Sequence, residues 1–324
     1  MRVSVCIPAM RADTLPAAIR SVRRQTRGYQ ELLVVVQGTS PAALPVAERE
    51  LRGEPRARIV AIPSPGASRA RNAAFDHAAG DVLAMMDDDC EAAPGWLGAL
   101  VGCLEDDPGA GLASGALLPP RTARGGLSVC PTLIPTEARY DPRDGRPVPA
   151  GWDWVSANFA IRRSVIDRVG HFDEHLGAGT EFGSAEELDY KLRLEQLGIP
   201  MRSTPRAAVT HTYGTRAGLL AVLRHHRHYA RGFGAMAGKL SLLGDPRGEA
   251  FLEGTLRTWQ EDLGSPRRLH RAPQHLRRWL HARRAYQQVL RRYRLDSRGL
   301  LIPREGDPDW QDPPRRGVSA GRRA

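Results

Sequence analysis

Lysine, paired cysteines and long apolar segments are all scarce in this sequence of 324 residues. Lys191 and Lys239 are the only two lysines, so nearly all of the positive charge is carried by arginine. None of the four cysteines belongs to a C-x-x-C pair, which argues against a zinc site or a disulfide framework. No apolar run approaches the roughly 20 residues that a helix needs to cross a bilayer. The composition therefore favours a globular protein with an ordinary hydrophobic core.

The N-terminal residues carry no recognisable targeting signal. Residues 1–8 have a basic start and an apolar run that is too short for a signal peptide, and no small-residue cleavage site follows. We interpret this run as a first strand and expect the protein to stay in the cytoplasm.

Positive charge is concentrated in the last third of the chain. The net charge is +11, and residues 212–324 hold 23 of the 47 basic residues but only 10 of the 36 acidic ones. Apolar residues recur at helical spacing from Leu219 to Leu240 and again from Leu276 to Tyr293. We therefore predict a basic helical appendage at 216–302 and a disordered tail at 303–324.

The first two-thirds of the chain alternates strand and helix patterns. Strands are predicted at residues 3–8, 32–36, 58–62 and 82–86. Helices are predicted after Asp13 as N-cap, at 66–79 with Gly80 closing the helix, and at 94–105. This order predicts a parallel sheet with helices on both faces, whose ligands bind beyond the carboxyl ends of the strands.

The pattern weakens beyond residue 118. Residues 119–151 are rich in Pro, Gly and Arg without periodicity, which predicts a long, partly mobile loop. Further strands are predicted at 154–161, 201–204 and 207–211, and further helices at 163–169 and 186–197.

Three acidic residues, Asp87, Asp88 and Asp89, directly follow the predicted fourth strand. Adjacent carboxylates repel one another, and a divalent cation such as Mn²⁺ or Mg²⁺ would relieve the repulsion while also binding phosphate oxygens. An acidic surface turn is the simpler alternative. The place of the run at a parallel-strand end favours the cation site.

Two other segments suggest binding chemistry. Gly66 precedes a helix start, where free N–H groups suit anions, and Arg69 and Arg71 could add charge-assisted contacts. An exposed basic helix turn is the alternative. His211 ends a predicted strand, and its neutral imidazole could bind a nearby metal or be purely structural.

A second acidic group opens the predicted helix 186–197. Glu186 alone would satisfy the helix dipole, so the adjacent Glu187 could instead deprotonate an acceptor hydroxyl as general base. Asp189 follows two residues later. Helix capping remains the alternative for the whole group.

Taken together, these segments resemble glycosyltransferase family 2, the inverting GT-A transferases, from Val3 to about His211. The order and spacing of several weak motifs make the match. The matching segments are Val3–Pro8, Ser21–Thr26 (S-V-x-x-Q-T), Gly66–Asn72 (G-x-x-x-A-R-N), Asp87–Asp89 (D-x-D), Phe159–Arg163, Gly170–Glu174 and Glu186–Asp189 (E-E-x-D).

The resemblance implies an α/β fold of GT-A type over residues 1–215, with a mostly parallel, Rossmann-like sheet flanked by helices. It implies direct displacement with inversion, with Glu187 as catalytic base and a nucleotide-sugar as donor. The implied roles are donor binding by Pro8, Gln37, Arg71, Asp87 and Asp88, Mn²⁺ or Mg²⁺ binding by Asp89 and His211, and acceptor binding by Glu186 and Asp189.

Two positions depart from the family pattern. Family members usually carry acidic residues after the second strand, where this chain has Gln37, whose amide can still hydrogen-bond a nucleobase. The base is Glu187 where Asp is usual, which lengthens its reach.

Other functions fit part of the sequence. A nucleotidyltransferase of similar fold would share the acidic run, but it does not need the pair Glu186–Glu187. The arginine-rich C-terminal region could contact nucleic acid, although no helix-turn-helix, zinc finger or aromatic platform accompanies it, and we expect no nucleic-acid partner. The basic amphipathic helix predicted from Leu219 to Leu240 could instead lie on an anionic membrane at the inner face. The acceptor could be a carbohydrate, a lipid-linked molecule or a small molecule.

Overall fold

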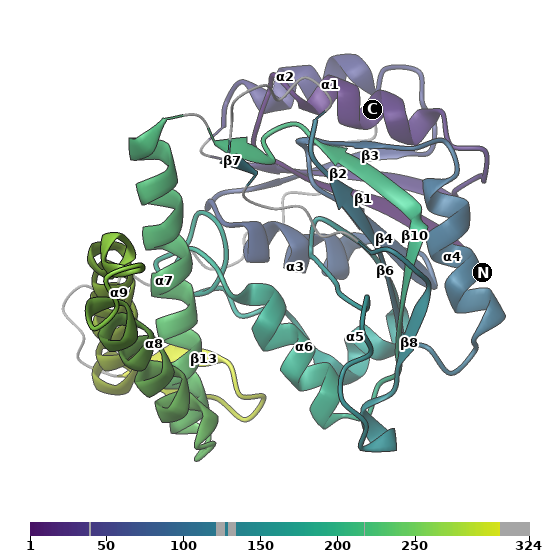
Figure 1. The fold of residues 1–324 in the computed structure, drawn as a ribbon. Coiled ribbons are helices and arrows are strands. Elements are labelled where there is room, and N and C mark those ends of the chain that lie inside the picture. Colours follow the sequence, from purple (N-terminus) through teal and green to yellow (C-terminus); the bar gives the residue numbers. More distant parts are fainter. Residues whose placement is uncertain (39, 121–126, 129–133, 217, 305–324) are drawn as a thin grey trace. The chain divides into compact units, whose positions relative to one another are not determined.

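The computed structural model describes residues 1–38, 40–120, 127–128, 134–216 and 218–304 (Figure 1). The described chain forms two compact units. Of the described residues, the first comprises Met1–His171 and Tyr190–Arg216, and the second comprises Phe172–Asp189 and Gly218–Arg304. Most of the predicted disordered tail, from residue 305, lies outside the described residues, as do parts of the predicted mobile loop.

A nine-stranded, mostly parallel sheet forms the centre of the first unit. The four N-terminal strands pair in parallel in the order β3-β2-β1-β4, and β1, β2 and β4 are buried along their whole length. Continuous apolar runs such as Leu32–Val36 suit strands that are covered on both faces. The bounds are β1 Val3–Ala9, β2 Glu31–Gln37, β3 Ala57–Ile62 and β4 Val82–Met86.

The remaining strands complete the sheet, and three of them, β5, β8 and β9, run antiparallel to their neighbours. β9 runs antiparallel between β4 and β6, and β5 pairs antiparallel with the end of β10. The bounds are β5 Cys90–Ala92, β6 Leu112–Leu118, β8 Ala138–Tyr140, β9 Asn158–Arg162 and β10 Met201–His211. The prediction of a mostly parallel sheet flanked by helices is confirmed.

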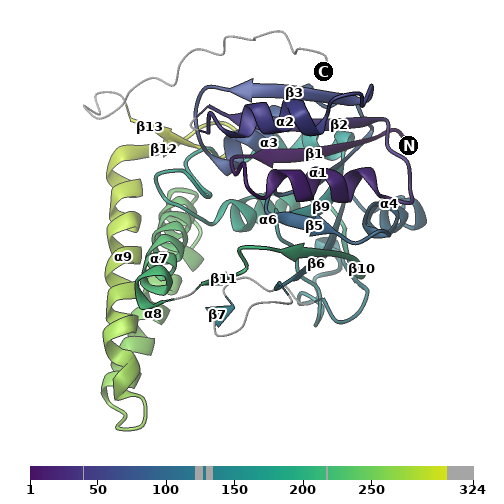
Figure 2. The same ribbon diagram turned by 90° about the horizontal axis from the view of Figure 1, so that it is seen from above.

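Helices cover both faces of this sheet (Figures 1 and 2). The apolar side chains of α1, α2 and α4 join those of β1, β2 and β4 in one continuous core. On the opposite face, Phe75 of α3 packs against Tyr190 of α6, with ring centroids 6.2 Å apart. The bounds are α1 Leu15–Arg23, α2 Ala43–Glu50, α3 Ala67–His77, α4 Trp96–Asp106, α5 Arg163–Val169 and α6 Glu186–Gln196.

Two predicted helix boundaries are wrong. Thr14, not Asp13, occupies the N-cap position of α1, because the carboxylate of Asp13 instead accepts a hydrogen bond from the hydroxyl of Tyr213. α3 ends at His77, before Gly80. Gly80 has a packing role, because a Cβ there would lie 2.6 Å from the backbone nitrogen of Ser4.

Three predictions beyond residue 118 also need correction. The strand predicted at 154–161 begins only at Asn158, and the two short strands predicted at 201–211 are one strand with a register shift between Thr204 and Val209. The predicted loop 119–151 contains β8, a 3₁₀ turn and β7. The bounds are Pro142–Asp144 for the 3₁₀ turn, β7 Leu127–Ser128 and β11 Thr215–Arg216, which pairs with β7.

The second unit is a helical bundle with a small hairpin. Its close packing depends on glycine: a Cβ at Gly234 would lie 2.1 Å from the carbonyl oxygen of Ala282, so the backbones of α7 and α9 touch there. α8 was not predicted, and Tyr293 lies in a strand rather than in the predicted helix. The bounds are α7 Leu219–Leu242, α8 Arg247–Leu263, η2 Leu269–Arg271, α9 Ala272–Arg292, β12 Tyr293–Leu295 and β13 Leu301–Pro303.

Among the described residues, no helix combines the length and the hydropathy needed to span a bilayer.

A buried ion cluster stabilises the second unit. The Lys239 ammonium lies 2.7 Å from a carboxylate oxygen of Asp173 and also pairs with Asp189, and all three side chains are at most 2% exposed. Asp173 additionally accepts the backbone N–H of Leu301 at 2.9 Å. Lys239 thus joins the segment 172–189 to α7, and Asp173 joins it to the C-terminal hairpin.

We predict that Lys239→Met lowers the free energy of unfolding by about 3–5 kcal/mol, since it leaves buried carboxylates without their counter-charge. Urea unfolding followed by circular dichroism measures the change. Arg257→Met, which removes an exposed cation of α8, is the matched control and should change stability by less than about 0.5 kcal/mol. Equal stability of the two variants would contradict the structural role of Lys239.

Candidate active site

The acidic run lies at the carboxyl end of β4, beside the end of β1. The two strands are parallel neighbours, so the turns that follow them meet at one edge of the sheet. Asp88 accepts hydrogen bonds from the backbone N–H groups of Met10 and Arg11, at 2.5 and 2.6 Å. The turn after the first strand therefore holds the middle residue of the run.

Asp88 is 3% exposed, and burial raises the pKa of its carboxyl group to about 6, although the two backbone hydrogen bonds work in the opposite direction. The neighbouring charge of Asp89 adds to the increase. This carboxylate carries negative charge at neutral pH at a free-energy cost, which a nearby cation would reduce.

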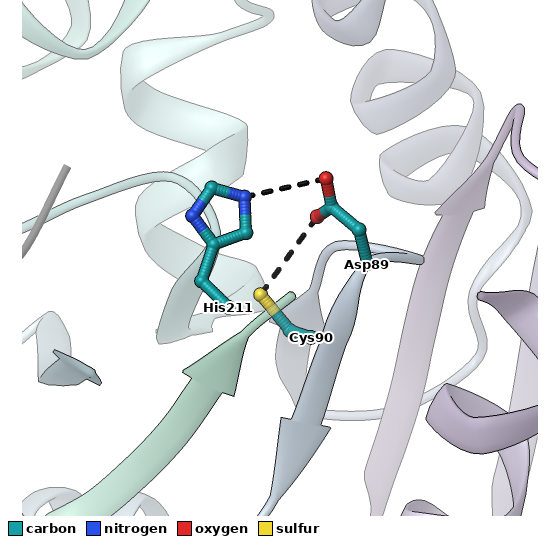
Figure 3. Close-up of side chains that lie close together, drawn as sticks. All are labelled: Asp89, Cys90 and His211. Carbon is teal, nitrogen blue, oxygen red and sulfur yellow. Dashed lines mark hydrogen bonds and ion pairs between the residues drawn. The ribbon is translucent and has the colours of Figure 1, made fainter. Parts of the chain in front are cut away.

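Strand pairing brings His211 to Asp89. β5 begins directly after Asp89 and pairs with the end of β10, so that Cys90 lies opposite His211 in the register. The Nε2 atom of His211 lies 3.2 Å from Oδ2 of Asp89 (Figure 3). Burial would raise the pKa of Asp89, but the hydrogen bond and charge of His211 and the charge of Arg11 outweigh it and lower this pKa.

Asp89, Cys90 and His211 form a group that could hold a metal ion. One potential ligand atom from each residue lies within 4.8 Å of the others, and all three side chains converge in Figure 3. The Nδ1 atom of His211 is buried and has no hydrogen-bond partner in the described part of the chain. Carboxylate and imidazole donors suit Mn²⁺, and the carboxylate suits Mg²⁺, so these residues fit the cation predicted from the sequence.

The first acid of the run pairs with the arginine of the predicted anion-binding segment. Gly66 precedes α3 with φ of 135°, and the helix then carries Arg71 toward the sheet edge. Nη2 of Arg71, whose side chain is 3% exposed, lies 2.9 Å from Oδ1 of Asp87, which is 28% exposed. The structure therefore brings five predicted site residues together in the first unit: Arg71, Asp87, Asp88, Asp89 and His211.

The other two predicted donor residues lie in strands. Pro8 is buried in β1 and opposite Val35 of β2. Gln37 ends β2, and its side-chain oxygen accepts the backbone N–H of Gly66 at 2.8 Å. That oxygen is thus used to join the end of β2 to the start of α3.

The predicted catalytic and acceptor residues lie in the second unit. Glu186 and Glu187 open α6, where Glu186 is buried and Glu187 is half-buried. Ala185, just before them, has φ of 79° and is the single non-glycine residue with positive φ in the described chain. Such backbone strain is typical of functional sites, which favours a function for the adjacent carboxylates.

Asp189 points into the interior of the second unit. It is 1% exposed and pairs with Lys239. This gives Asp189 a packing role, and its expected contact with an acceptor stays a prediction.

Sequence reasoning missed three residues of this site: Arg11, Cys90 and Tyr213. The guanidinium of Arg11 lies 3.1 Å from Asp89 and over the ring of Tyr213, 5.1 Å from its centroid. Arg11 follows the end of a parallel strand, so the argument that singled out Asp87–Asp89 could have found it. No local pattern could have identified Tyr213.

A mostly parallel sheet with helices on both faces and an acidic run at its carboxyl edge is the architecture of the GT-A fold. The model of the family "Glycosyl transferase family 2" matches residues 4–118, about a third of the chain. The resemblance to this family is confirmed over that segment, and so is the prediction that the chain is a glycosyltransferase.

Similar proteins include a curated relative and two solved structures. The glucosyl-dolichyl phosphate glucuronosyltransferase of Haloferax volcanii is 28% identical over 221 residues, which cover 65% of this chain and 69% of that protein. The mannosyltransferase PcManGT of Pyrobaculum calidifontis, solved with GDP-Man and Mn²⁺, has a TM-score of 0.54 at 15% identity, covering 88% of this chain and 87% of its own. TarS 1–349 of S. aureus has a TM-score of 0.52 at 15% identity, covering 95% and 98%.

The raised pKa of Asp88 predicts a pH-dependent loss of stability. Between pH 4 and 6 the folded protein keeps a proton on Asp88 that the unfolded chain has already lost. The stability linked to this proton is therefore fully present below pH 3.8 and is lost as the pH rises through about 6. Relative to Asp88→Asn, the free energy of unfolding of the wild type should fall by about 2–2.5 kcal/mol from pH 4 to 7.

Urea unfolding at several pH values with EDTA present measures this difference. Asp106→Asn replaces an exposed acid at the end of α4 and is the control. Its free energy of unfolding should change with pH in the same way as that of the wild type. The same pH dependence in Asp88→Asn would show that Asp88 has an ordinary pKa.

Proposed function

We propose that this glycosyltransferase moves a sugar from a nucleotide-sugar donor to an acceptor hydroxyl, with inversion and with a divalent cation bound at Asp89. The observation that carries the proposal is the contact between Asp89 and His211 at the carboxyl edge of the parallel strands. An oxygen and a nitrogen ligand from distant parts of the chain meet there, beside two further acids.

Asp89 and His211 would hold the cation, Mn²⁺ or Mg²⁺. The ion would neutralise charge that develops on the departing diphosphate. PcManGT, whose complex contains GDP-Man and Mn²⁺, supports both the ion and the donor class. Cys90 lies within reach, but its thiol is buried in the core cluster, and it is a softer ligand than Mn²⁺ or Mg²⁺ prefers.

Five residues would bind the rest of the donor. Arg71, held by Asp87, would place positive charge beside the diphosphate. Asp87 and Asp88 would contact the ribose or water bound to the cation. Gln37 would contact the nucleobase through its amide nitrogen, because its oxygen is taken by the N–H of the residue before α3, and Pro8 would line the site from β1.

Glu187 would act as the general base. Its carboxylate takes the proton of the acceptor hydroxyl, whose oxygen bonds to the anomeric carbon from the side opposite the leaving group. The bond from that carbon to the diphosphate oxygen breaks, and its electron pair leaves with the nucleoside diphosphate. One displacement inverts the configuration. Glu186 would orient the acceptor.

We propose a lipid-linked saccharide as acceptor. The Haloferax relative is named for transfer to glucosyl-dolichyl phosphate, and it aligns with most of this chain. A carbohydrate or a small molecule would offer the same hydroxyl chemistry.

Asp89→Ala is predicted to abolish Mn²⁺-dependent donor binding, since it removes the ligand that pairs with His211. A thermal-shift screen of nucleoside diphosphates and sugar nucleotides with Mn²⁺ tests this, because a ligand of the native state raises the melting temperature. Asp106→Asn should behave as the wild type. Formation of a nucleoside diphosphate from the best donor supports the proposal, whereas pyrophosphate exchange would support a nucleotidyltransferase.

Glu187→Gln is predicted to lower kcat by about two to four orders of magnitude, the usual effect of losing a general base, while donor affinity stays within about twofold. Isothermal titration measures the donor affinity, and the rate of product formation at saturating substrate measures kcat. Glu195→Gln, further along α6, is the matched control and should keep kcat within a few fold. Full activity of Glu187→Gln would overturn the assignment.

We further propose that the second unit contacts an anionic membrane, where a lipid-linked acceptor would lie. The apolar stripe of α7 is not available for this from Ala230 to Leu240, because it packs inside the unit. The more suitable surface is one end of the bundle, defined by exposed leucines and arginines: Leu220, Leu263, Leu269, Arg267, Arg268 and Arg271.

Contacts between the helices place these residues toward one end. His275 at the start of α9 lies 2.6 Å from Asp262 at the end of α8, and Gln274 lies 3.2 Å from His226 in the first third of α7. The three leucines are 78%, 53% and 50% exposed. Apolar side chains among arginines suit a surface with acyl chains below and negative headgroups above.

The double variant Leu263→Ser, Leu269→Ser is predicted to sediment at least about threefold less with vesicles of anionic and neutral lipid, because the apolar anchors are lost. Leu197→Ser, at an exposed leucine of the first unit, is the control. Equal sedimentation of all three proteins would end the proposal. Tighter binding to duplex DNA than to vesicles would favour a nucleic-acid partner instead.

A further inference from the structure

Arg11 pairs with both buried acids of the site. Its Nη1 atom lies 3.1 Å from Oδ2 of Asp89 and 3.6 Å from Oδ1 of Asp88. The same Oδ2 atom faces Nε2 of His211 at 3.2 Å. Two cationic or potentially cationic groups thus share the oxygen that would bind a metal ion.

A divalent ion on Asp89 and His211 would compete directly with this arginine. It would take the Oδ2 atom that Arg11 contacts, and like charges a few ångströms apart repel, by about 1–2 kcal/mol even at the dielectric constant of water. Arg11 and the ion therefore exclude each other from the same carboxylate.

The side chain of Arg11 has room to move, although its backbone is fixed. Its N–H donates to Asp88 at 2.6 Å, which holds the main chain, while the side chain is 45% exposed. The guanidinium also lies over the Tyr213 ring, which the hydroxyl contact with Asp13 holds in place. A cation–π contact of this kind can keep the charge near the site after it leaves the carboxylate.

We propose that Arg11 is a displaceable counter-cation: it neutralises Asp88 and Asp89 before the donor binds, and the incoming divalent ion moves it from these carboxylates to the diphosphate of the donor. The inference rests on the proposed function and adds a coupling to it. Arg11 weakens binding of the ion alone and strengthens binding of ion and nucleotide together, so that the ion binds firmly only with its substrate.

Replacing Arg11 with a neutral residue should therefore have opposite effects on two affinities. Without its competitor, the cation should bind Arg11→Gln about tenfold tighter in the absence of nucleotide. With saturating Mn²⁺, a nucleoside diphosphate should bind the variant about tenfold weaker, because one charge-assisted contact is lost. A residue that merely supports the fold would weaken both.

The test measures free Mn²⁺ by electron paramagnetic resonance and nucleotide binding by isothermal titration, with UDP and GDP as probes. Arg20→Gln is the matched control, since Arg20 is an exposed arginine of the same unit that pairs with Glu50. It should match the wild type in both measurements. Circular dichroism and the melting temperature show whether each variant is folded.

Arg11→Lys separates charge from structure. Because it keeps the positive charge, its Mn²⁺ affinity should stay within about threefold of the wild type. Unchanged or weaker Mn²⁺ binding by folded Arg11→Gln, or tighter binding by Arg11→Lys, would overturn the inference while leaving the proposed function intact. A wild type that binds neither Mn²⁺ nor either nucleotide would overturn both.

Discussion

The site depends on buried carboxylates that need a positive charge. Asp88 and Asp89 are adjacent, almost inaccessible to water and close enough to repel each other. Arg11 and His211 supply the compensating groups, and each comes from a different strand end. An ionised acid in a poorly solvated place is stable only beside a cation. This edge of the sheet therefore suits the exchange of Arg11 for a divalent ion that we propose.

The second unit also contains buried carboxylates, and there the compensating positive charge is fixed in place. Lys239 is fully buried between Asp173 and Asp189, without the exposure that lets Arg11 move. One cluster fixes the start of α6, where the strained Ala185 precedes Glu186 and Glu187. A rigid anchor beside a strained turn suits a carboxylate that must be held in one orientation.

Much of the fold could be predicted because its signals are local. The runs of β1, β2 and β4 are apolar on both faces, and α5 follows its predicted bounds. The errors arose where distant contacts decide. Asp13 turns to Tyr213 rather than to its own helix, and Gly80 is required by the backbone of Ser4. α8 was missed, although its apolar residues also recur at helical spacing.

The sequence by itself determined the resemblance to the family, the alternation of strands and helices that makes a parallel sheet, and the placing of three acids at a strand end, because these depend on residue types at short spacing. Only the tertiary structure decided which groups meet those acids. Three strands lie between Arg11 and Asp89 in the sequence, and His211 reaches Asp89 through the pairing of β5 with β10. Pairing between distant segments leaves no local pattern, so the sequence could propose His211 as a metal ligand, but only the folded chain shows that it meets Asp89 and that Arg11 does so too.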